Sequence, residues 1–419
     1  MKNIAPASDV TRRDFLRGSS FAAMMMMLGG VEITAQEKPK QAASGHDEKP
    51  PGPPVNCAVI GLGTWGREIL GYLGRLPNTP VVNICETYPA SLRRAATAAP
   101  KAAGVNDYRQ VLDNKDVHAV FVATPTHQHK EIVLAALQAG KHVYCEAPLA
   151  HTIDDARIIA KSAAAAKNLT FQSGLQYRAN PQHHHVLDFV RTGATGKITV
   201  ARSQWHKKES WRRTSPSADR EKELNWRLNK DVSPGLIGEI GVQQIDVASW
   251  FLRERPVSVT GFGSVLHWTD GRTVPDTIQA IVEYPGGIRM AYDATLTNSF
   301  DSNYDMFLGT DSAIILRENR AWMFKEADAP LLGWEVYARK DEFFGSGETG
   351  IALVANATKL IAQGLKPAEA QANTDTPTYF SVKEFIESIN YKTAPNAGYK
   401  EGFEATVVGL KANEAVTKG

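Results

Sequence analysis

The stretch VNCAVIGLGTWG at residues 55–66 decides the fold of this chain. Its first half is apolar, β-branched and short enough for a buried parallel strand, and its second half is the glycine pattern G-x-G-x-x-G. Apolar residues then recur at helical spacing at Ile69, Leu70 and Leu73. The order strand, glycine turn, helix predicts a dinucleotide-binding unit, because free N–H groups at the start of the helix can hold a pyrophosphate.

An acidic residue that follows at the expected distance supports this interpretation over a glycine turn that binds no nucleotide. Residues 80–85 form a predicted second strand that ends at Glu86, whose carboxylate we expect to bind the adenosine ribose hydroxyls. Glu86 would repel a 2′-phosphate, and no arginine follows it directly, so the sequence predicts NAD rather than NADP. The phosphate-binding turn is predicted to comprise Gly61, Gly63, Thr64, Trp65 and Gly66.

Length and composition indicate a globular protein with two domains. The 419 residues exceed one ordinary domain, and the formal charge of +2 indicates neither a nucleic-acid partner nor a membrane-surface partner. The three cysteines, Cys57, Cys85 and Cys145, fall in or at the end of predicted buried strands. Their odd number and position argue against a disulfide framework and against a metal cluster, so we predict no metal site.

The N-terminal residues are typical of a targeting segment. Arg12 and Arg13, followed by Phe15-Leu16 and a short apolar run at residues 21–28, resemble the twin-arginine signal of bacterial proteins that are exported already folded. The apolar run is too short for a membrane anchor. We predict a signal peptide at residues 1–35, a linker at 36–54 and a periplasmic or extracellular location, with tightly held NAD carried along. The alternative is a disordered basic N-terminus.

The pattern after the linker predicts two domains. Residues 55–172 alternate strand and helix, which predicts a Rossmann domain with a doubly wound parallel sheet. Residues 173–419 predict an α+β domain with an open, largely antiparallel sheet and a hairpin at residues 285–287. Its strands are expected at about 197–205, 257–265, 277–284, 288–295 and 312–316, and its helices at about 180–192, 235–252, 347–362, 381–389 and 402–417.

Three further stretches resemble the glucose–fructose oxidoreductase / inositol dehydrogenase family, known as Gfo/Idh/MocA. They are ATPTHQH at 123–129, AGKHVYCEAPLA at 139–150 and GEIGVQQID at 238–246. The resemblance implies an NAD(P)-binding Rossmann domain, a C-terminal domain whose open sheet often forms an oligomer interface, and hydride exchange between a sugar-like hydroxyl and the nicotinamide. Carried over by position, the residues expected near the cofactor are Ala123, Thr124, Pro125, His127 and Glu146.

The chain departs from the family pattern at the residues that move the proton. Ala147 replaces the usual lysine, Gln243 the usual histidine, and Glu239 an aspartate. Alanine has no hydrogen-bonding side chain, and a glutamine amide does not titrate near neutral pH. The usual acid/base pair is therefore absent.

Other titratable residues are candidates for this role. The predicted catalytic residues are Glu239, His129, Tyr177 and His206, and the predicted substrate residues are Arg178, Gln243, Asp246 and Trp226. Glu239 and Asp246 are seven residues apart on one predicted helix and should share a face; Asp246 either titrates or only orients a neighbour. Residues 183–185 are three consecutive histidines, which point about 100° apart on a helix and cannot share one metal ion. The long segment 207–225 is either a lid, a partner contact or a disordered excursion.

The sequence thus predicts an exported NAD-dependent oxidoreductase that acts on a sugar or glycoside hydroxyl with tightly bound cofactor. Two alternatives stay open: a redox-neutral NAD-dependent glycoside hydrolase, and a nucleotide- or sugar-binding protein without turnover. By resemblance, we expect a homo-oligomer, a dimer or tetramer, formed through the C-terminal sheet. The short N-terminal apolar run predicts no membrane anchor.

Overall fold

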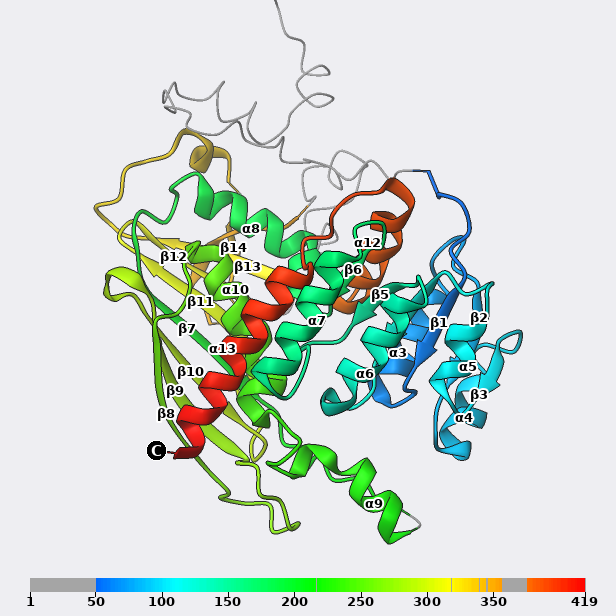
Figure 1. Ribbon diagram of the computed structural model, residues 1–419. Coiled ribbons are helices and arrows are strands. Elements are labelled where there is room, and N and C mark those ends of the chain that lie inside the picture. Colours follow the sequence, from blue (N-terminus) through cyan, green and yellow to red (C-terminus); the bar gives the residue numbers. More distant parts are fainter. Residues whose placement is uncertain are drawn as a thin grey trace, which may run out of the picture.

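The computed structural model describes residues 50–215, 217–317, 319–338, 340–343, 346–355 and 375–418. In these residues the chain forms two sheets that lie side by side, with helices between and around them (Figure 1). The predicted signal peptide and most of the predicted linker lie outside the described residues. Among the helices that the structure describes, none has both the length and the apolar character of a membrane span.

The first sheet has six parallel strands in the order β3-β2-β1-β4-β5-β6. The order reverses between β1 and β4, and ligands of such sheets bind at the carboxyl ends of the strands at this point. Cys57, Cys85 and Cys145 are buried and free in these strands. The strands are β1 (Cys57–Ile60), β2 (Val81–Cys85), β3 (Ala103–Val105), β4 (Ala119–Val122), β5 (His142–Cys145) and β6 (Phe171–Ser173).

Helices alternate with these strands, as the sequence predicts. The helix that follows β5 is capped as predicted: the Thr152 hydroxyl accepts a hydrogen bond from the Asp155 N–H at 3.1 Å. The helices are α3 (Thr64–Leu73), α4 (Pro89–Ala96), α5 (Tyr108–Asp113), α6 (His129–Gln138) and α7 (Ile153–Ala165). A short 3₁₀ turn, η1 (Thr126–Gln128), lies between β4 and α6.

The second sheet has nine strands in the order β14-β15-β13-β12-β11-β7-β10-β9-β8. Only β7 and β10 pair in parallel; the other neighbours are antiparallel, and β9 and β10 form the predicted hairpin. The strands are β7 (Ile198–His206), β8 (Ser258–Ser264), β9 (Thr277–Glu283), β10 (Arg289–Thr295), β11 (Asn303–Gly309), β12 (Ser312–Arg317), β13 (Arg320–Lys325), β14 (Lys340–Glu342) and β15 (Thr349–Ala352).

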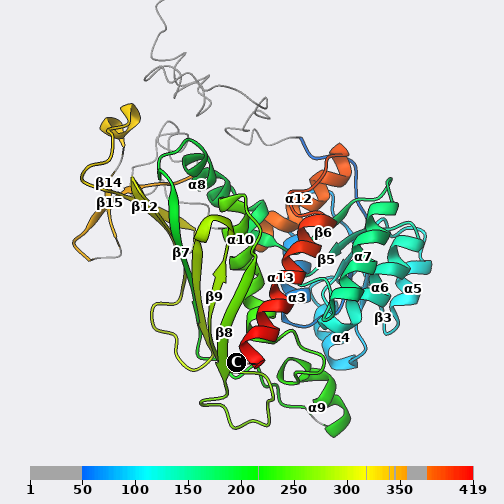
Figure 2. The same cartoon turned by 60° about the vertical axis from the view of Figure 1, so that its left-hand side comes forward.

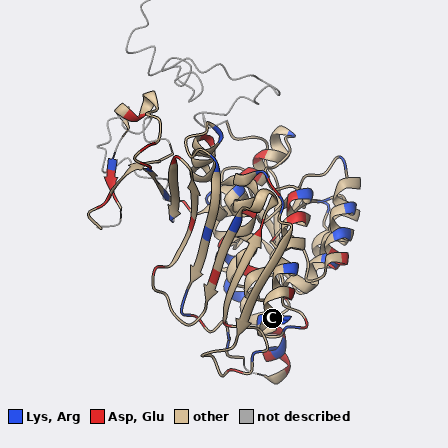
Figure 3. Cartoon of the chain, turned by 90° about the vertical axis from the view of Figure 1, so that its left-hand side faces the viewer, with Lys and Arg blue, Asp and Glu red and all other residues tan. Residues whose placement is uncertain are grey.

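One face of this sheet is covered by helices and the other is open in the described part of the chain (Figure 3). The helix α13 lies between the two sheets, against β8 on one side and α7 on the other (Figure 2). The helices are α8 (Pro181–Arg191), α9 (Ala218–Leu224), α10 (Val242–Leu252), α12 (Pro377–Tyr391) and α13 (Tyr399–Lys418), and the short turns are η2 (Gln176–Ala179), η3 (Trp226–Leu228), η4 (Ile237–Gly241), η5 (Pro285–Gly287) and η6 (Gly333–Tyr337).

Two predictions about the second domain are wrong. The predicted helix at 347–362 begins as the strand β15, because pairing with β13 and β14 decides the conformation of a short apolar run that fits either structure; residues 356–374 lie outside the described part. The helix α12 belongs to the core of the first domain, where Val382, Phe385 and Ile386 pack with β1 and α3. The chain therefore returns to the Rossmann domain after leaving it, and residues 173–419 do not form a separate packing unit.

Candidate active site

The glycine turn after β1 has the shape that a dinucleotide needs. Gly61 has a φ of +89°, and a Cβ at Gly66 would lie 1.8 Å from the carbonyl oxygen of Gly61, so both positions require glycine. At Gly63, by contrast, a Cβ would meet no atom within 4 Å, which leaves open space where a pyrophosphate approaches the backbone. Gly63 also begins α3 without a side-chain cap, so the N–H groups of the first turn, from Thr64 and Trp65 onward, are available to phosphate.

Glu86 lies at the end of β2, beside this turn. Its Oε2 accepts a hydrogen bond from the Leu62 N–H at 3.0 Å, and its Oε1 accepts one from the Tyr88 N–H at 3.0 Å. The carboxylate is thereby held in place, with lone pairs left for ribose hydroxyls. The residues at both turns therefore fit the adenosine and pyrophosphate parts of NAD.

Several polar atoms without partners mark the other end of the cofactor site. Thr124 follows β4 between Ala123 and Pro125, and its Oγ1 is buried with no hydrogen-bond partner in the described residues. The Oε1 of Gln243 is likewise buried with no hydrogen-bond partner in the described residues. The Nε2 of the same side chain donates to the carbonyl oxygen of Gly174 at 2.8 Å. Buried polar atoms rarely stay unpaired, so we interpret these two oxygens as positions that meet the cofactor or the substrate.

Glu146 directly follows β5, and its carboxyl is strongly changed by its surroundings. Burial and the nearby charge of Glu68 raise the pKa of Glu146 to about 8, against the attraction of Arg227. The carboxyl lies against Gly174, where a Cβ would come within 2.7 Å of Oε2. A carboxyl with this pKa can both release and accept a proton near neutral pH.

Glu239 connects the two domains at the site. Its Oε1 accepts a hydrogen bond from the Thr126 hydroxyl at 2.9 Å, and its Oε2 accepts one from the Arg227 Nε at 3.0 Å. The Glu239 side chain is 3% exposed and the Arg227 side chain 37%. Burial raises the pKa of Glu239, and Arg227 opposes this. Because both oxygens are engaged, Glu239 holds Arg227 toward the site and is a positioning residue rather than a free base.

Aromatic rings flank this cluster. The His127 ring lies 5.9 Å from Trp226 and 6.1 Å from His151, measured between centroids. Burial and the neighbouring His151 lower the pKa of His127, so its imidazole is neutral at neutral pH. Its Nδ1 has no partner in the described residues. The predicted residues His127 and Trp226 thus lie together, whereas His151 matches no motif that would have predicted it.

His129, predicted as catalytic, lies away from the open part of the site. Its side chain is buried, and its ring nitrogens lie 3.2 Å from the carbonyl oxygen of Pro148 and 2.9 Å from that of Thr124. Burial lowers its pKa to about 4. His129 therefore fastens the turn after β4 to the loop after β5. Its place in α6 turns the ring inward, which spacing alone does not reveal.

The predicted residues of η2 and α10 bind one another. Arg178 donates two hydrogen bonds to Asp246, at 2.7 and 2.9 Å, in a buried fork. The Tyr177 ring stacks on His183 at 4.6 Å, and burial raises the pKa of Tyr177. Asp246 and Glu239 have different partners, and Glu239 lies in η4, a π-helical turn. That the two carboxylates share a face stays a prediction.

His206, also predicted as catalytic, points to the opposite face of its sheet. Side chains alternate along a strand, and on β7 the inner positions are those of Ala201 and the other core residues. His206 instead contacts Asp293 and the carbonyl oxygen of Phe300 on the open face. The preceding residue, Trp205, is the one that packs inward.

The three consecutive histidines of α8 point in different directions, as helix geometry requires. His183 stacks on Tyr177, and the ring of His184 packs edge-on against Trp250. His185 packs in the same way against Phe189. In the part of the chain that the structure describes, no three His, Cys, Asp or Glu side chains gather as a metal site would require.

Comparisons with known proteins agree with this geometry. Residues 55–174 match the Gfo/Idh/MocA oxidoreductase family with its NAD-binding Rossmann fold, and residues 183–315 match the Gfo/Idh/MocA C-terminal domain. A levoglucosan dehydrogenase from Pseudarthrobacter phenanthrenivorans is 28% identical over 297 residues, which are 64% of this chain and 74% of that protein. A 2,7-anhydro-N-acetylneuraminate hydratase from Escherichia coli is 24% identical over 262 residues, 62% of this chain and 67% of that protein.

Solved structures share the fold. The structure of a levoglucosan dehydrogenase in complex with NADH and L-sorbose superimposes with a TM-score of 0.69 at 22% identity, over 87% of this chain and 97% of the other. Two family matches that together span most of the described core, and a glycine turn shaped for a dinucleotide, lead to one conclusion. The chain belongs to the Gfo/Idh/MocA family of oxidoreductases, and its cofactor is NAD.

Proposed function

We propose that the protein oxidises or reduces a ring hydroxyl of a sugar, anhydro sugar or glycoside, with Glu146 as the group that exchanges the proton. The similarity to a levoglucosan dehydrogenase supports the substrate class. Bound NAD supplies the hydride acceptor. The hydroxyl proton needs a base, and neither Ala147 nor Gln243 can serve.

The observation that carries this proposal is the place of the buried Glu146 carboxyl, which lies against Gly174, the residue whose carbonyl oxygen Gln243 contacts. Burial there raises the pKa of Glu146 to about 8. Arg227 and the unpaired Oε1 of Gln243 offer a donor and an acceptor that would orient neighbouring hydroxyls. Trp226 offers an apolar ring beside Arg227, whose guanidinium carbon lies 5.1 Å from the ring centre. A hydroxylated ring therefore meets stacking, hydrogen bonding and a titratable carboxyl in one place.

The test is hydride exchange with a panel of free sugars, anhydro sugars and glycosides, followed by the absorbance of the reduced nicotinamide. We expect turnover with at least one member, and a loss of about 10²–10⁴-fold in kcat for Glu146→Gln with little change in NAD affinity. The matched control is Glu254→Gln, because Glu254 is an exposed carboxylate after α10. Full activity of Glu146→Gln would remove Glu146 from the proton transfer.

A second candidate is redox-neutral cleavage or hydration of a glycoside. The similarity to a hydratase that acts on an anhydro sugar favours it, as does the loss of the usual acid/base pair at Ala147 and Gln243. In that reaction a transient ketone acidifies the adjacent C–H, elimination follows, and water addition and hydride return complete the cycle. Product formed in deuterated water would then carry deuterium at the adjacent carbon, without net reduction of NAD. A protein that binds NAD but shows neither reaction would be a binding protein.

Export by the twin-arginine route is also part of the proposal. Arg12 and Arg13 support it, with the apolar run that follows them. Cell fractionation should find the wild-type protein in the periplasm or medium with NAD bound, and the double variant Arg12→Lys, Arg13→Lys in the cytoplasm. Equal distribution of the two would contradict export by this route.

We also propose that the protein assembles into a dimer or tetramer through the open face of the second sheet. Apolar side chains on β8 and β9 support it, since Phe262 is 68% exposed and Ile281 44% exposed. Light scattering should give a mass above one chain for the wild type and a lower mass for Ile281→Asp. A wild-type monomer would contradict this assembly.

A further inference from the structure

The excursion, described at residues 207–215 and 217–225, reaches from the second domain to the nucleotide site. It leaves the end of β7, and its helix α9 lies near α4, on the side of the Rossmann sheet where Glu86 is found (Figures 1 and 2). Nothing in the proton transfer or the substrate contacts described above uses this helix. Its position beside the adenosine end of the cofactor site therefore needs its own explanation.

Arg220 makes the contact between α9 and this end of the site. One of its terminal nitrogens lies 3.7 Å from Oε1 of Glu86, and its guanidinium carbon lies 4.7 Å from the centre of the Tyr88 ring. Its other terminal nitrogen donates to Glu223 at 2.9 Å. The side chain is 17% exposed, and its Nε is buried with no partner in the described residues. A donor left unpaired beside the ribose-binding carboxylate indicates a ligand atom that it meets.

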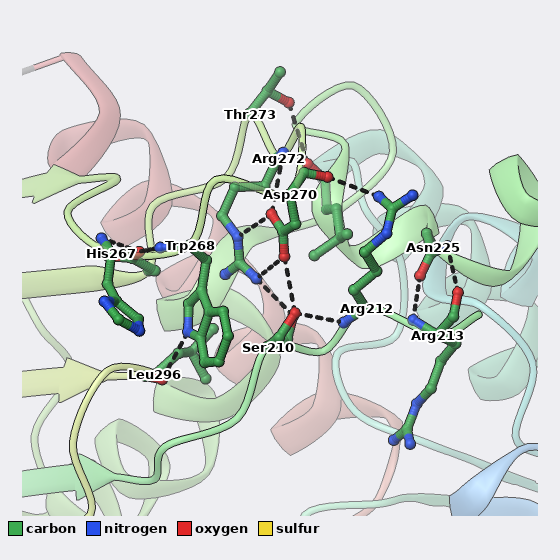
Figure 4. Close-up of polar contacts among 12 residues, drawn as sticks. Ser210, Arg212, Arg213, Asn225, His267, Trp268, Asp270, Arg272, Thr273 and Leu296 are labelled. Atoms are coloured by element: carbon green, nitrogen blue, oxygen red, sulfur yellow. Dashed lines mark hydrogen bonds and ion pairs between the residues drawn. The ribbon is translucent and has the colours of Figure 1, made fainter.

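The base of the excursion is held by a compact polar network (Figure 4). Arg272, whose side chain is 1% exposed, donates from Nε to Asp270 at 2.8 Å, and the Ser210 hydroxyl donates to the same carboxylate at 2.8 Å. Arg212 donates to the Asp270 carbonyl oxygen at 2.7 Å. Burial opposes ionisation of Asp270, but the hydrogen bonds from Arg272 and Ser210 lower its pKa to about 2. The network is therefore ionised and intact at neutral pH.

The two ends of the excursion are also tied to each other. The Arg213 N–H donates to Oδ1 of Asn225 at 2.7 Å, and the Asn225 amide donates back to the Arg213 carbonyl oxygen at 2.9 Å (Figure 4). Ser217 caps α9 by accepting from the Arg220 N–H at 3.3 Å. A closed stem and a capped helix present Arg220 at a defined place, so α9 behaves as an arm and not as a loose loop.

We propose that α9 is a strap over the adenosine end of NAD, in which Arg220 completes the adenosine pocket together with Glu86 and Tyr88. A planar guanidinium stacks on aromatic rings such as adenine, and its free Nε can donate to a ribose or adenine acceptor. Because Arg220 comes from the second domain, the cofactor leaves only when α9 moves away from Glu86. The strap accordingly slows cofactor release. It does not depend on which sugar the enzyme uses.

The test is the release rate of NAD, measured without any sugar substrate. Bound NAD is displaced by excess unlabelled NAD, or followed by the change in protein fluorescence, in the wild type, Arg220→Ala and Lys222→Ala. Lys222 is an exposed residue of the same helix, so its variant removes the same charge without the contact. We expect Arg220→Ala to release NAD about tenfold faster, as the loss of one charge-assisted contact predicts, and Lys222→Ala to match the wild type.

Two further measurements separate the strap from other roles of Arg220. AMP should lose affinity for Arg220→Ala by the same factor as NAD, whereas nicotinamide mononucleotide should not. In the wild type, AMP should slow amide hydrogen exchange in residues 218–224, which tests the proposal even if the variant folds poorly. Unchanged NAD release together with unchanged exchange would overturn the strap. A loss confined to NADP would overturn it as well, because Arg220 would then serve a 2′-phosphate. Since no sugar is present, failure of the oxidoreductase proposal leaves this test intact.

Discussion

In the reaction that we propose, three residues at the site divide between them the work that the usual lysine and histidine of the family would share. Glu146 is the titratable group, Arg227 is the donor, and Gln243 fixes an acceptor by anchoring its amide to Gly174. Glu239 keeps the aspartate-like position but serves Arg227 and Thr126. In this proposal, the change of residue type at two positions moves the proton transfer to a neighbouring carboxyl whose pKa burial has already raised.

Glu146 should make the stability of the protein fall with rising pH. Its pKa is raised from 4.5 to about 8, so between these values the folded chain keeps a proton that the unfolded chain has lost. The stabilising effect is complete below about pH 4.5 and is lost as the pH rises through about 8. Urea unfolding across this window should therefore show Glu146→Gln gaining stability relative to the wild type. Parallel curves for the two proteins would show that Glu146 ionises normally.

Glu68 should set the pH at which Glu146 works. Its charge raises the pKa of Glu146, so Glu68→Gln should move the ascending limb of the pH–rate profile for hydroxyl oxidation to lower pH. Tyr72 donates to Glu68 at 2.8 Å. The control Tyr72→Phe removes that hydrogen bond but keeps the charge of Glu68. The ascending limb of its pH–rate profile should lie at the same pH as that of the wild type. If the ascending limb lies at the same pH in Glu68→Gln and in the wild type, the limb reports the ionisation of a group other than Glu146.

At the scale of elements, α12 is the segment whose place matters most for the site. Phe385 is fully buried and packs edge-on against Phe121 of β4 at 5.2 Å and near Tyr144 of β5 at 5.8 Å, between ring centroids. These two strands end just before Thr124 and Glu146, at Val122 and Cys145. A helix from the C-terminal part of the chain therefore packs under the two strands that lead to the nicotinamide end of the cofactor site.

Removing the Phe385 ring should weaken both the fold and the cofactor site. Phe385→Ala should cost about 3–5 kcal/mol of unfolding free energy, because it leaves a cavity in a fully packed cluster. NAD affinity should fall as the ends of β4 and β5 loosen. Phe380→Ala, a half-buried ring on the same helix, should cost less on both measures in chemical denaturation and NAD titration. Equal costs would show that α12 contributes no specific support.

At the scale of the whole molecule, the two sheets are joined by contacts that cross between them more than once. α12 packs in the first domain, α13 lies between the sheets, and the pairs Thr126–Glu239 and Arg220–Glu86 bridge them at two ends of the cofactor site. The cofactor therefore lies between parts that the chain order separates, and its binding couples them.

The Rossmann segment alone should not fold stably. A fragment of residues 50–172 would expose the surface of β4 and β5 that Phe385 covers. Fusing residues 375–391 to this fragment should restore a cooperative thermal transition and NAD binding. Circular dichroism and NAD titration of both fragments check this. A stable fragment without α12 would contradict the view that this helix belongs to the first domain.

Sequence patterns within short segments were sufficient to predict the fold of the first domain and its cofactor. The glycine spacing, the acid at Glu86 and the alternation of strand and helix identify the cofactor and its domain, because each depends on residues that are close in the chain. The same rules misjudged His129 and His206, since whether a side chain points inward or outward depends on what packs around its element.

The sequence by itself determined the dinucleotide fold and the family of this protein, and it predicts that the usual proton-transferring pair is missing. Only the tertiary structure brought together the residues that we propose in its place. Thr126 and Glu239 are 113 residues apart, and Arg220 reaches Glu86 from another domain. Such contacts, and the pKa values that burial creates, arise when distant segments pack together and exclude water. No local pattern of residues carries that information.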